Sequence, residues 1–282
     1  MLRHQLVGAL LFAVIGAVVL RFSGLLHWGA ELHAMPARTQ PAKRANVPVP
    51  GCIGWTESVS DNKSSVHSPP YQVRVPDNYV ADRPWPLAVV LPPAGRSAAL
   101  VERHAGLTAT LTSSGFVVAF VGASGRFSMA TLHRYRMLPE RIALDFCVDP
   151  NRVLWLGHSN GATASLALAL GTVGAVNGDG LVLSGVGWDT HAFEDKSCPK
   201  PLDVLVMHGA KDKHFPNYGR DTANWLAMCN GCAVEPWLGP AGCLNWSNCE
   251  ATTRYCESSQ GHWPWAGSSD QLIRWLRQRG AF

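Results

Sequence analysis

The chain has 282 residues, of which 47% are hydrophobic and 16% charged, and its formal net charge is +4. This composition is sufficient for one sizeable core, and strand and helix patterns continue without a linker from about residue 70, so we expect one folded domain over residues 51–282. No basic stripe interleaved with aromatic residues occurs, which argues against a nucleic-acid partner.

The start of the chain has the features of an export signal. A short basic stretch precedes the apolar residues 6–20, and Arg21 ends the run. A run of this length is typical of a signal-peptide core, because a membrane span needs about 20 residues. We therefore expect residues 1–34 to be a cleaved signal peptide, with an uncleaved N-terminal anchor as the alternative. Either one predicts a secreted or periplasmic protein, and the Pro- and Ala-rich residues 35–50 are typical of an extended linker.

The cysteine pattern agrees with export. The even set of eight predicts disulfides and consists of Cys52, Cys147, Cys198, Cys229, Cys232, Cys243, Cys249 and Cys256. Cys229 and Cys232 form a C-x-x-C pair, but a zinc site would need a second such pair at a suitable spacing. A thioredoxin-like redox motif would follow a strand, whereas this pair follows the helical run 222–228. We interpret the pair as parts of two structural bridges of open connectivity, and we expect no metal.

Strand and helix patterns alternate through the rest of the chain. Strands are predicted at 71–75, 86–91, 116–121, 153–156, 180–184 and 203–209, with short late strands at 234–238 and 252–255. Helices are predicted over 98–111, within 128–146, after 161, and at 222–228 and 270–279. This alternation predicts an α/β fold with right-handed crossovers, a three-layer sandwich around a mainly parallel sheet.

Residues 153–169 carry the main functional signal. The apolar run 153–156 precedes the sequence GHSNG at 157–161, and an Ala- and Leu-rich helical run follows. This is the pattern G-x-S-x-G between a strand and a helix, the nucleophile elbow. The serine must adopt a strained backbone so that its hydroxyl projects, and the glycines let strand and helix approach closely. We interpret Ser159 as a nucleophile, with a purely structural turn as the alternative.

A serine nucleophile needs a base, and the base needs a carboxylate; in this kind of fold the chain order is Ser, acid, His. Asp212 follows the predicted strand 203–209, so it falls on a loop at the carboxyl end of a strand, where sites collect in open α/β sheets. We interpret Asp212 as the acid, with a solvated loop carboxylate as the alternative. Competing acids that lack a suitable preceding strand are Asp179, Asp189, Asp195 and Asp221.

Three histidines follow residue 200, namely His208, His214 and His262. His208 ends a predicted strand and is interpreted as structural, while His214 is too near Asp212 in sequence to be an obvious partner. His262 lies in the rigid Gly-, Pro- and Trp-rich loop 261–265 and is interpreted as the base. His158 points away from the serine by the geometry of the turn and is interpreted as packing.

The remaining requirement is an oxyanion hole, formed by two backbone N–H donors. One is predicted to be the N–H of Asn160, directly after the nucleophile. The other should come from the loop after the strand 86–91. Pro92 and Pro93 cannot donate, so Ala94 or Gly95 is the candidate.

With these residues in place, residues 70–280 resemble the secreted poly(3-hydroxybutyrate) depolymerase and feruloyl or acetylxylan esterase group of α/β-hydrolases. The matching sequences are VP at 75–76, PL at 86–87, VDPNRV at 148–153, GHSNG at 157–161, HG-x-x-D at 208–212, NGC at 230–232 and GHW at 261–263. The resemblance implies an α/β-hydrolase domain, the triad Ser159, Asp212 and His262, and pairing of Cys232 with a later cysteine such as Cys249. It implies no cofactor.

The chain departs from this group on the substrate side. Pro92-Pro93 stands where the group usually carries His-Gly, and the sequence HWPW at 262–265 replaces H-x-W-P-G. The sequence thus predicts a secreted serine esterase acting on polyhydroxyalkanoate, feruloyl or acetyl esters. A serine peptidase of the same fold and a non-catalytic binding protein are the alternatives, and acyl and alcohol specificity and the oligomeric state stay open.

Overall fold

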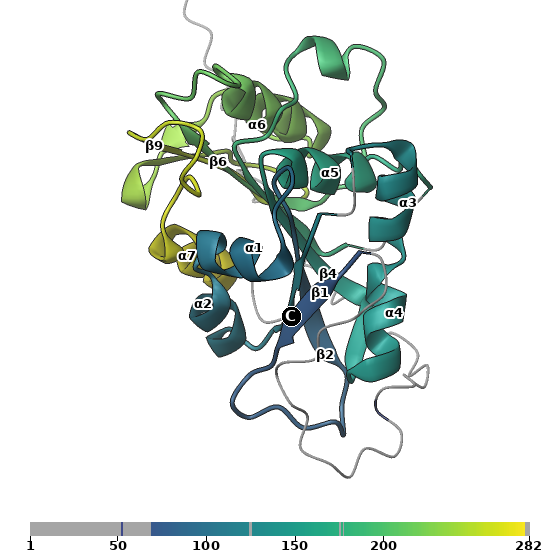
Figure 1. Ribbon diagram of the computed structural model, residues 1–282. Coiled ribbons are helices and arrows are strands. Elements are labelled where there is room, and N and C mark those ends of the chain that lie inside the picture. The colour runs from purple at the N-terminus through teal and green to yellow at the C-terminus, as the bar shows by residue number, and fades with distance from the viewer. Residues whose placement is uncertain (1–51, 53–68, 124–125, 175, 177, 280–282) are drawn as a thin grey trace, which may run out of the picture. The chain divides into compact units, whose positions relative to one another are not determined.

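Nine strands form one sheet in the part of the chain that the computed structural model describes, which is Cys52 and residues 69–123, 126–174, 176 and 178–279. The predicted signal peptide (1–34) and linker (35–50) lie outside the described residues. The sheet carries two helical layers, as Figure 1 shows.

The strands follow an order in which chain neighbours are often not sheet neighbours. Across the sheet they are β1 (Tyr71–Arg74), β3 (Val117–Val121), β2 (Trp85–Leu91), β4 (Val148–His158), β5 (Gly180–Ser184), β6 (Asp203–Gly209), β9 (Thr253–Ser258), β8 (Cys243–Asn245) and β7 (Trp237–Leu238). Pairing is parallel from β3 to β9 and antiparallel at β1, β8 and β7. The carboxyl ends of six central strands therefore meet at one edge, where sites form in such folds.

The two faces of the sheet are buried under different helices. Alternate residues of β2 point to opposite faces: Leu87, Val89 and Leu91 to one, Ala88 and Val90 to the other. The first face is covered by α3 (Met129–Arg136), α4 (Leu138–Asp145), α5 (Asn160–Ala169) and α6 (Tyr218–Cys229). The second is covered by α1 (Ala98–Ala105), α2 (Thr108–Ser113) and α7 (Ser269–Arg279). The predicted three-layer sandwich with a mainly parallel sheet is confirmed.

Two predicted helices are each divided in the structure. The pattern over 98–111 breaks at Gly106, which ends α1 in the left-handed conformation with φ 63°. The helix predicted within 128–146 becomes α3 and α4, because Met137 ends one and Pro139 stands in the first turn of the other, where a missing N–H is tolerated. Hydrophobic periodicity did not locate either break.

The late strands also differ from the prediction. The strand predicted at 234–238 is limited to β7, two exposed residues at the sheet edge. The strand predicted at 252–255 extends to Ser258 as β9, which pairs with β6 on one side and β8 on the other. Because β9 is parallel to β6, it delivers the following loop to the same sheet edge.

All eight cysteines form disulfides, in the pairs Cys52–Cys147, Cys198–Cys229, Cys232–Cys249 and Cys243–Cys256. The C-x-x-C cysteines thus belong to separate bridges, and Cys232 pairs with Cys249. Four bridges indicate an oxidising compartment, extracellular or periplasmic. Among the described residues no helix has the length and apolarity that crossing a membrane requires.

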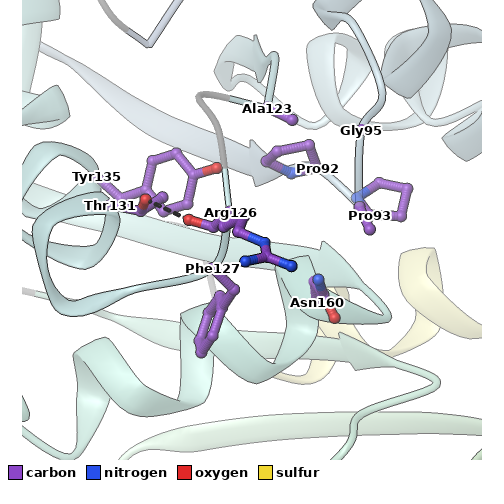
Figure 2. Close-up of a pocket in the computed structure, with 10 residues that line it drawn as sticks. Pro92, Pro93, Gly95, Ala123, Arg126, Phe127, Thr131, Tyr135 and Asn160 are labelled. Carbon is purple, nitrogen blue, oxygen red and sulfur yellow. Dashed lines mark hydrogen bonds between the residues drawn. The ribbon is translucent and has the colours of Figure 1, made fainter.

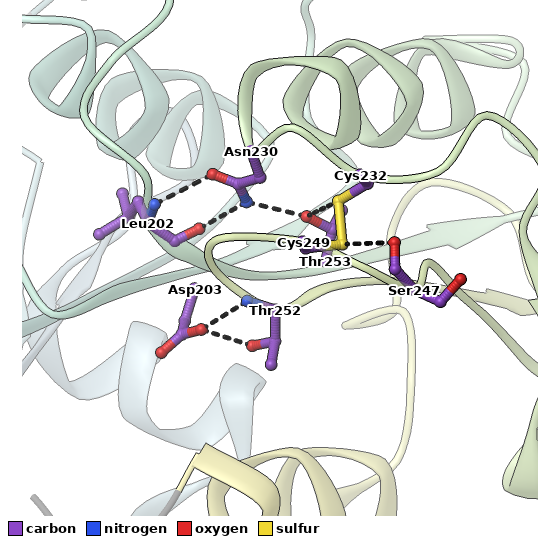
Figure 3. The surroundings of a disulfide bond; sticks show 8 residues. All are labelled: Leu202, Asp203, Asn230, Cys232, Ser247, Cys249, Thr252 and Thr253. Atoms are coloured by element: carbon purple, nitrogen blue, oxygen red, sulfur yellow. Dashed lines mark hydrogen bonds between the residues drawn. A yellow bond between two sulfur atoms is a disulfide. The ribbon is translucent and has the colours of Figure 1, made fainter. Parts of the chain in front are cut away.

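The Cys232–Cys249 bridge lies beside a buried amide, shown in Figure 3. The Asn230 side chain accepts from the N–H of Leu202 (3.1 Å) and donates to the Leu202 carbonyl (2.9 Å) and to the Thr253 hydroxyl (2.8 Å). One side chain therefore links the end of α6 to the residues that enter β6 and β9. This connection fixes the starts of the two strands whose far ends lead to Asp212 and His262.

Candidate active site

Ser159 stands at the junction of β4 and α5 in an unusual backbone conformation. Its φ is 54° and ψ −121°, and its N–H donates to the Ser184 carbonyl on the neighbouring strand β5 (2.9 Å). A β-carbon added at Gly157 would collide with the backbone of Gly161, and one at Gly161 would collide with the Leu91 carbonyl. The spacing G-x-S-x-G is therefore required by the close approach of β4, α5 and the end of β2.

His262 lies between Ser159 and Asp212. Its Nε2 is 2.9 Å from the Ser159 Oγ, and its Nδ1 is 2.7 Å from the Asp212 Oδ2. Asp212 follows β6 by three residues and His262 follows β9 by four, while Ser159 directly follows β4. The parallel sheet thus brings together the three side chains that the sequence predicted.

Asp212 is buried, with 5% of its surface exposed, and it is held by backbone donors. Its Oδ1 accepts from the N–H groups of His214 (2.8 Å) and Phe215 (3.0 Å), so its Oδ2 faces His262. Burial alone would raise the pKa of the Asp212 carboxyl. The hydrogen bonds from these N–H groups and the interaction with the His262 imidazole have the larger combined effect, so the pKa of Asp212 lies below its usual value. The carboxylate is therefore ionised and oriented toward Nδ1 of His262.

The two other late histidines support this arrangement. His208 is buried and its Nε2 donates to the Phe215 carbonyl (2.8 Å), and desolvation lowers its pKa, so it is a neutral structural group. The exposed His214 ring stacks on the His262 ring at a centroid distance of 4.9 Å, and the Phe215 ring meets His262 edge-on at 5.0 Å. His214 and Phe215 therefore both hold Asp212 through their backbones and confine the His262 ring through their side chains.

His158 joins the elbow to the His262 loop. It is 1% exposed, its Nδ1 is 2.9 Å from the Ser184 Oγ, and Ser184 Oγ also accepts from the Ala266 N–H (2.9 Å). Burial, together with the nearby His104 and His262 imidazoles, lowers the pKa of His158 to about 3, so this ring is neutral. Its 5.3 Å ring-centroid distance from His262 agrees with a packing role.

The predicted oxyanion donors lie around one cavity. It has a volume of about 570 Å³ and is bounded by the loop 92–95 on one side and by Asn160 on another, as Figure 2 shows. Residues 93–96 form a turn in which the Arg96 N–H donates to the Pro93 carbonyl (3.3 Å) and Gly95 has φ 69°. Within the described part of the chain, the N–H groups of Ala94 and Gly95 donate no hydrogen bond. The N–H of Asn160, at the start of α5, has no partner within its helix.

The wall of the cavity opposite the loop comes from residues after β3. Ala123, Phe127, Thr131 and Tyr135 line it, together with Arg126. The Thr131 hydroxyl donates to the Arg126 carbonyl (2.8 Å). The cavity is therefore mainly apolar, with a polar entrance beside Asn160.

The sequence reasoning missed three contributions to this site. The clamp on Asp212 is a local turn in which a carboxylate accepts from the second and third following N–H groups, so the spacing from Asp212 to Phe215 could have revealed it. The contribution of Ser184, which contacts His158 and the Ala266 N–H, was indicated only weakly, by a serine at the end of an apolar strand. Nothing in the sequence placed Arg126 at the cavity. Among the described residues no group of histidine, cysteine and acidic side chains could hold a metal ion.

No protein-family model and no curated protein matches the sequence. Solved structures do match by shape. An acetyl xylan esterase from Aspergillus awamori matches with a TM-score of 0.57 at 12% identity, covering 77% of this chain and 96% of that one. A carboxylesterase from Bacillus cereus matches with a TM-score of 0.56 at 13% identity, covering 76% and 96%. An S-formylglutathione hydrolase from Staphylococcus aureus matches with a TM-score of 0.53 at 12% identity, covering 77% and 96%.

These likenesses show that the chain has the α/β-hydrolase fold, as the sequence predicted. At such low identities the match concerns the fold alone. The resemblance to the poly(3-hydroxybutyrate) depolymerase and feruloyl esterase group stays a prediction.

Proposed function

We propose that this protein is a serine esterase in which Ser159 is the nucleophile, His262 the general base and Asp212 the orienting acid. The observation that carries the proposal is the double contact of His262, to Ser159 Oγ at 2.9 Å and to Asp212 Oδ2 at 2.7 Å. A hydroxyl is a poor nucleophile unless a base within hydrogen-bond reach takes its proton, and this geometry supplies such a base.

The tautomer of His262 follows from its partners. The ionised Asp212 holds the proton on Nδ1, so Nε2 is left to accept the proton of the Ser159 hydroxyl. The Ser159 oxygen then attacks the ester carbonyl, and the oxyanion that develops accepts from the N–H of Asn160 and from Ala94 or Gly95. His262 passes its proton to the leaving alcohol, and a water activated by His262 then hydrolyses the acyl-enzyme.

Three features support ester hydrolysis in an exported protein. The three matching structures described above are named as an acetyl xylan esterase, a carboxylesterase and an S-formylglutathione hydrolase. The cavity beside Asn160 is large enough for an acyl or small alcohol group and is mainly apolar. The four disulfides and the predicted signal peptide together favour secretion or a periplasmic location.

The test is hydrolysis of 4-nitrophenyl butyrate by the purified domain, with Ser159→Ala and the exposed-loop control Ser197→Ala. We expect Ser159→Ala to lower kcat by roughly 10⁵-fold or more and Ser197→Ala to leave it unchanged. A fluorophosphonate probe should label wild type and the control but not Ser159→Ala. Equal rates in wild type and Ser159→Ala would refute the proposal. A panel of poly(3-hydroxybutyrate), methyl ferulate, acetylated xylan and a matched anilide then separates the predicted ester classes and the peptidase alternative.

A further inference from the structure

Among the described residues, one charged side chain lines the cavity beside the elbow. Arg126 follows β3 and contributes to the wall opposite the loop 92–95. Figure 2 shows its guanidinium directed toward Asn160, between Phe127 and Pro93. The guanidinium thus faces the space next to the predicted oxyanion donor, and it is also in contact with solvent.

No residue in the part of the chain that the structure describes neutralises the Arg126 charge. Within the described part of the chain no carboxylate forms an ion pair or hydrogen bond with its guanidinium, and none of the residues lining the cavity is acidic. By contrast, the half-buried Arg74 of β1 is paired with Glu102 at 2.8 Å. A lone guanidinium beside an apolar wall raises the local concentration of anions.

The backbone of Arg126 is anchored, so the fold sets the point from which the side chain extends. The Thr131 hydroxyl, which is buried, donates to the Arg126 carbonyl at 2.8 Å. Ser128 begins α3 by accepting the Thr131 N–H at 3.3 Å, which ties the same segment to the helix. The guanidinium is therefore delivered to the cavity from an ordered turn.

We infer that Arg126 binds a carboxylate of the substrate, so that the preferred ester carries a negative charge on the part that enters this cavity. The inference rests on the proposed esterase function. A guanidinium offers a planar pair of N–H donors that matches one carboxylate. None of the other described residues lining the cavity is a cation that could match a dianionic phosphate, which favours the carboxylate. Arg126 is then a specificity-determining residue, separate from the three that would perform the chemistry.

The test compares esters that differ only in this charge. On the acyl side the pair is mono(4-nitrophenyl) adipate and 4-nitrophenyl hexanoate, and on the alcohol side it is 4-carboxyphenyl butyrate and phenyl butyrate. The measured quantity is the anionic-to-neutral ratio of kcat/KM in wild type and in Arg126→Gln. Because the guanidinium is partly solvated, we expect the ratio for one pair to fall by about 10-fold in the variant, and the affected pair identifies which part of the ester enters the cavity.

Three variants make the result specific. Arg126→Lys should retain part of the preference, Arg126→Glu should reverse it in favour of 4-nitrophenyl 6-aminohexanoate, and the exposed control Arg277→Gln should not alter it. Added salt should weaken the preference of the wild type for the anionic esters. An unchanged ratio in Arg126→Gln for both pairs, with neutral esters still hydrolysed, would overturn the inference and leave the esterase proposal intact.

A binding measurement keeps the two proposals separable. If no ester is hydrolysed, the proposed function is wrong, and calorimetric titration with hexanoate and its neutral amide, hexanamide, still decides the role of Arg126. We expect hexanoate to bind about 10-fold more tightly than hexanamide to wild type, and this difference to disappear in Arg126→Gln. Equal binding of the acid and the amide to wild type would also overturn the inference.

Discussion

The two sides of Ser159 are built in different ways. On the side of β6 and β9, Asp212 and His262 are buried, and each of their polar atoms in the site has a directed partner. On the side of β2 and β3, prolines and Phe127 line a cavity in which Arg126 is the one charged side chain among the residues described. The hydrogen bonds on the first side hold the His262 ring and its proton in one position. The cavity on the second side can accommodate different substrate groups.

This difference predicts how substitutions on each side will behave. Changes on the His262 side should lower kcat or stability, because they break buried hydrogen bonds whose partners have no alternative. Changes on the cavity side should alter substrate preference and leave the free energy of unfolding nearly unchanged. The following experiments test that contrast.

Asp212→Asn should have the largest effect. The amide oxygen would still accept the N–H groups of His214 and Phe215, which turns the amide NH₂ toward His262 Nδ1 and moves the ring proton to Nε2. In that tautomer Nε2 cannot accept the serine proton, so kcat should fall by about 10⁴-fold. Steady-state hydrolysis of 4-nitrophenyl butyrate measures this, with Asp195→Asn, an exposed loop acid, as the matched control. A loss of less than about 10-fold would show that Asp212 does not orient the base.

The next effect concerns stability and pH, through His158. Burial lowers the pKa of this histidine from 6.5 to about 3 in the folded protein, so between these values the unfolded chain binds a proton that the folded chain does not. The free energy of unfolding must therefore decrease as the pH falls below about 6.5, by roughly 2–3 kcal/mol between about pH 7 and about pH 4.5. Asp212, whose pKa is lowered in the folded protein, contributes to the pH dependence of stability only below the lower limit of this pH range.

Urea unfolding of wild type and His158→Asn at several pH values measures this effect. Asparagine keeps a polar atom near the position of Nδ1 and removes the titrating group, so the variant should lose that share of the pH dependence. The exposed His133→Asn serves as the control and should retain it. Parallel stability–pH curves for wild type and His158→Asn would show that the His158 ring is not the group responsible.

Ser184→Ala should have a moderate effect on both activity and stability. It removes the oxygen shared by His158 Nδ1 and the Ala266 N–H, so two buried groups lose a partner at a cost of about 1–3 kcal/mol. Because Ala266 follows His262 closely, kcat should fall by about 10-fold with KM unchanged, as expected of a positioning residue. Thermal unfolding and steady-state kinetics measure both, with the exposed Ser113→Ala as control. A rise in KM at constant kcat would instead assign Ser184 to substrate binding.

Phe127→Ala should have the smallest effect. Its side chain is 44% exposed and lines the cavity, so truncation removes apolar contact surface for the substrate and little core packing. We expect KM for 4-nitrophenyl hexanoate to rise by about 3-fold, with kcat and the melting temperature unchanged. As a control, Leu144→Ala on α4, where the side chain is also exposed and lies outside the cavity lining, should change neither constant. A drop in melting temperature of more than about 5 °C in Phe127→Ala would contradict the proposed contrast between the two sides.

The features that the sequence determined are those whose cause is local. The elbow depends on five consecutive residues, since only glycine at 157 and 161 allows the strand and helix to approach. Hydrophobic runs located β2, β3, β4, β5 and β6, although the start of β4 at Val148 was missed, and β9 was expected only as a short strand over 252–255. Asp212 could be selected because it directly follows such a strand. The breaks at Gly106 and Met137 were missed, because a helix can turn without changing its hydrophobic period.

The tertiary structure alone decided the contacts between residues distant in sequence. His262 meets Ser159 across 103 positions, and Ser184 meets Ala266 across 82, because the sheet places β9 and β5 on the same side of β4. The disulfide pairs and the entry of Arg126 into the cavity depend on the same strand order. A sequence pattern reports what each segment requires of its own backbone, whereas the order of strands results from packing every segment against the others.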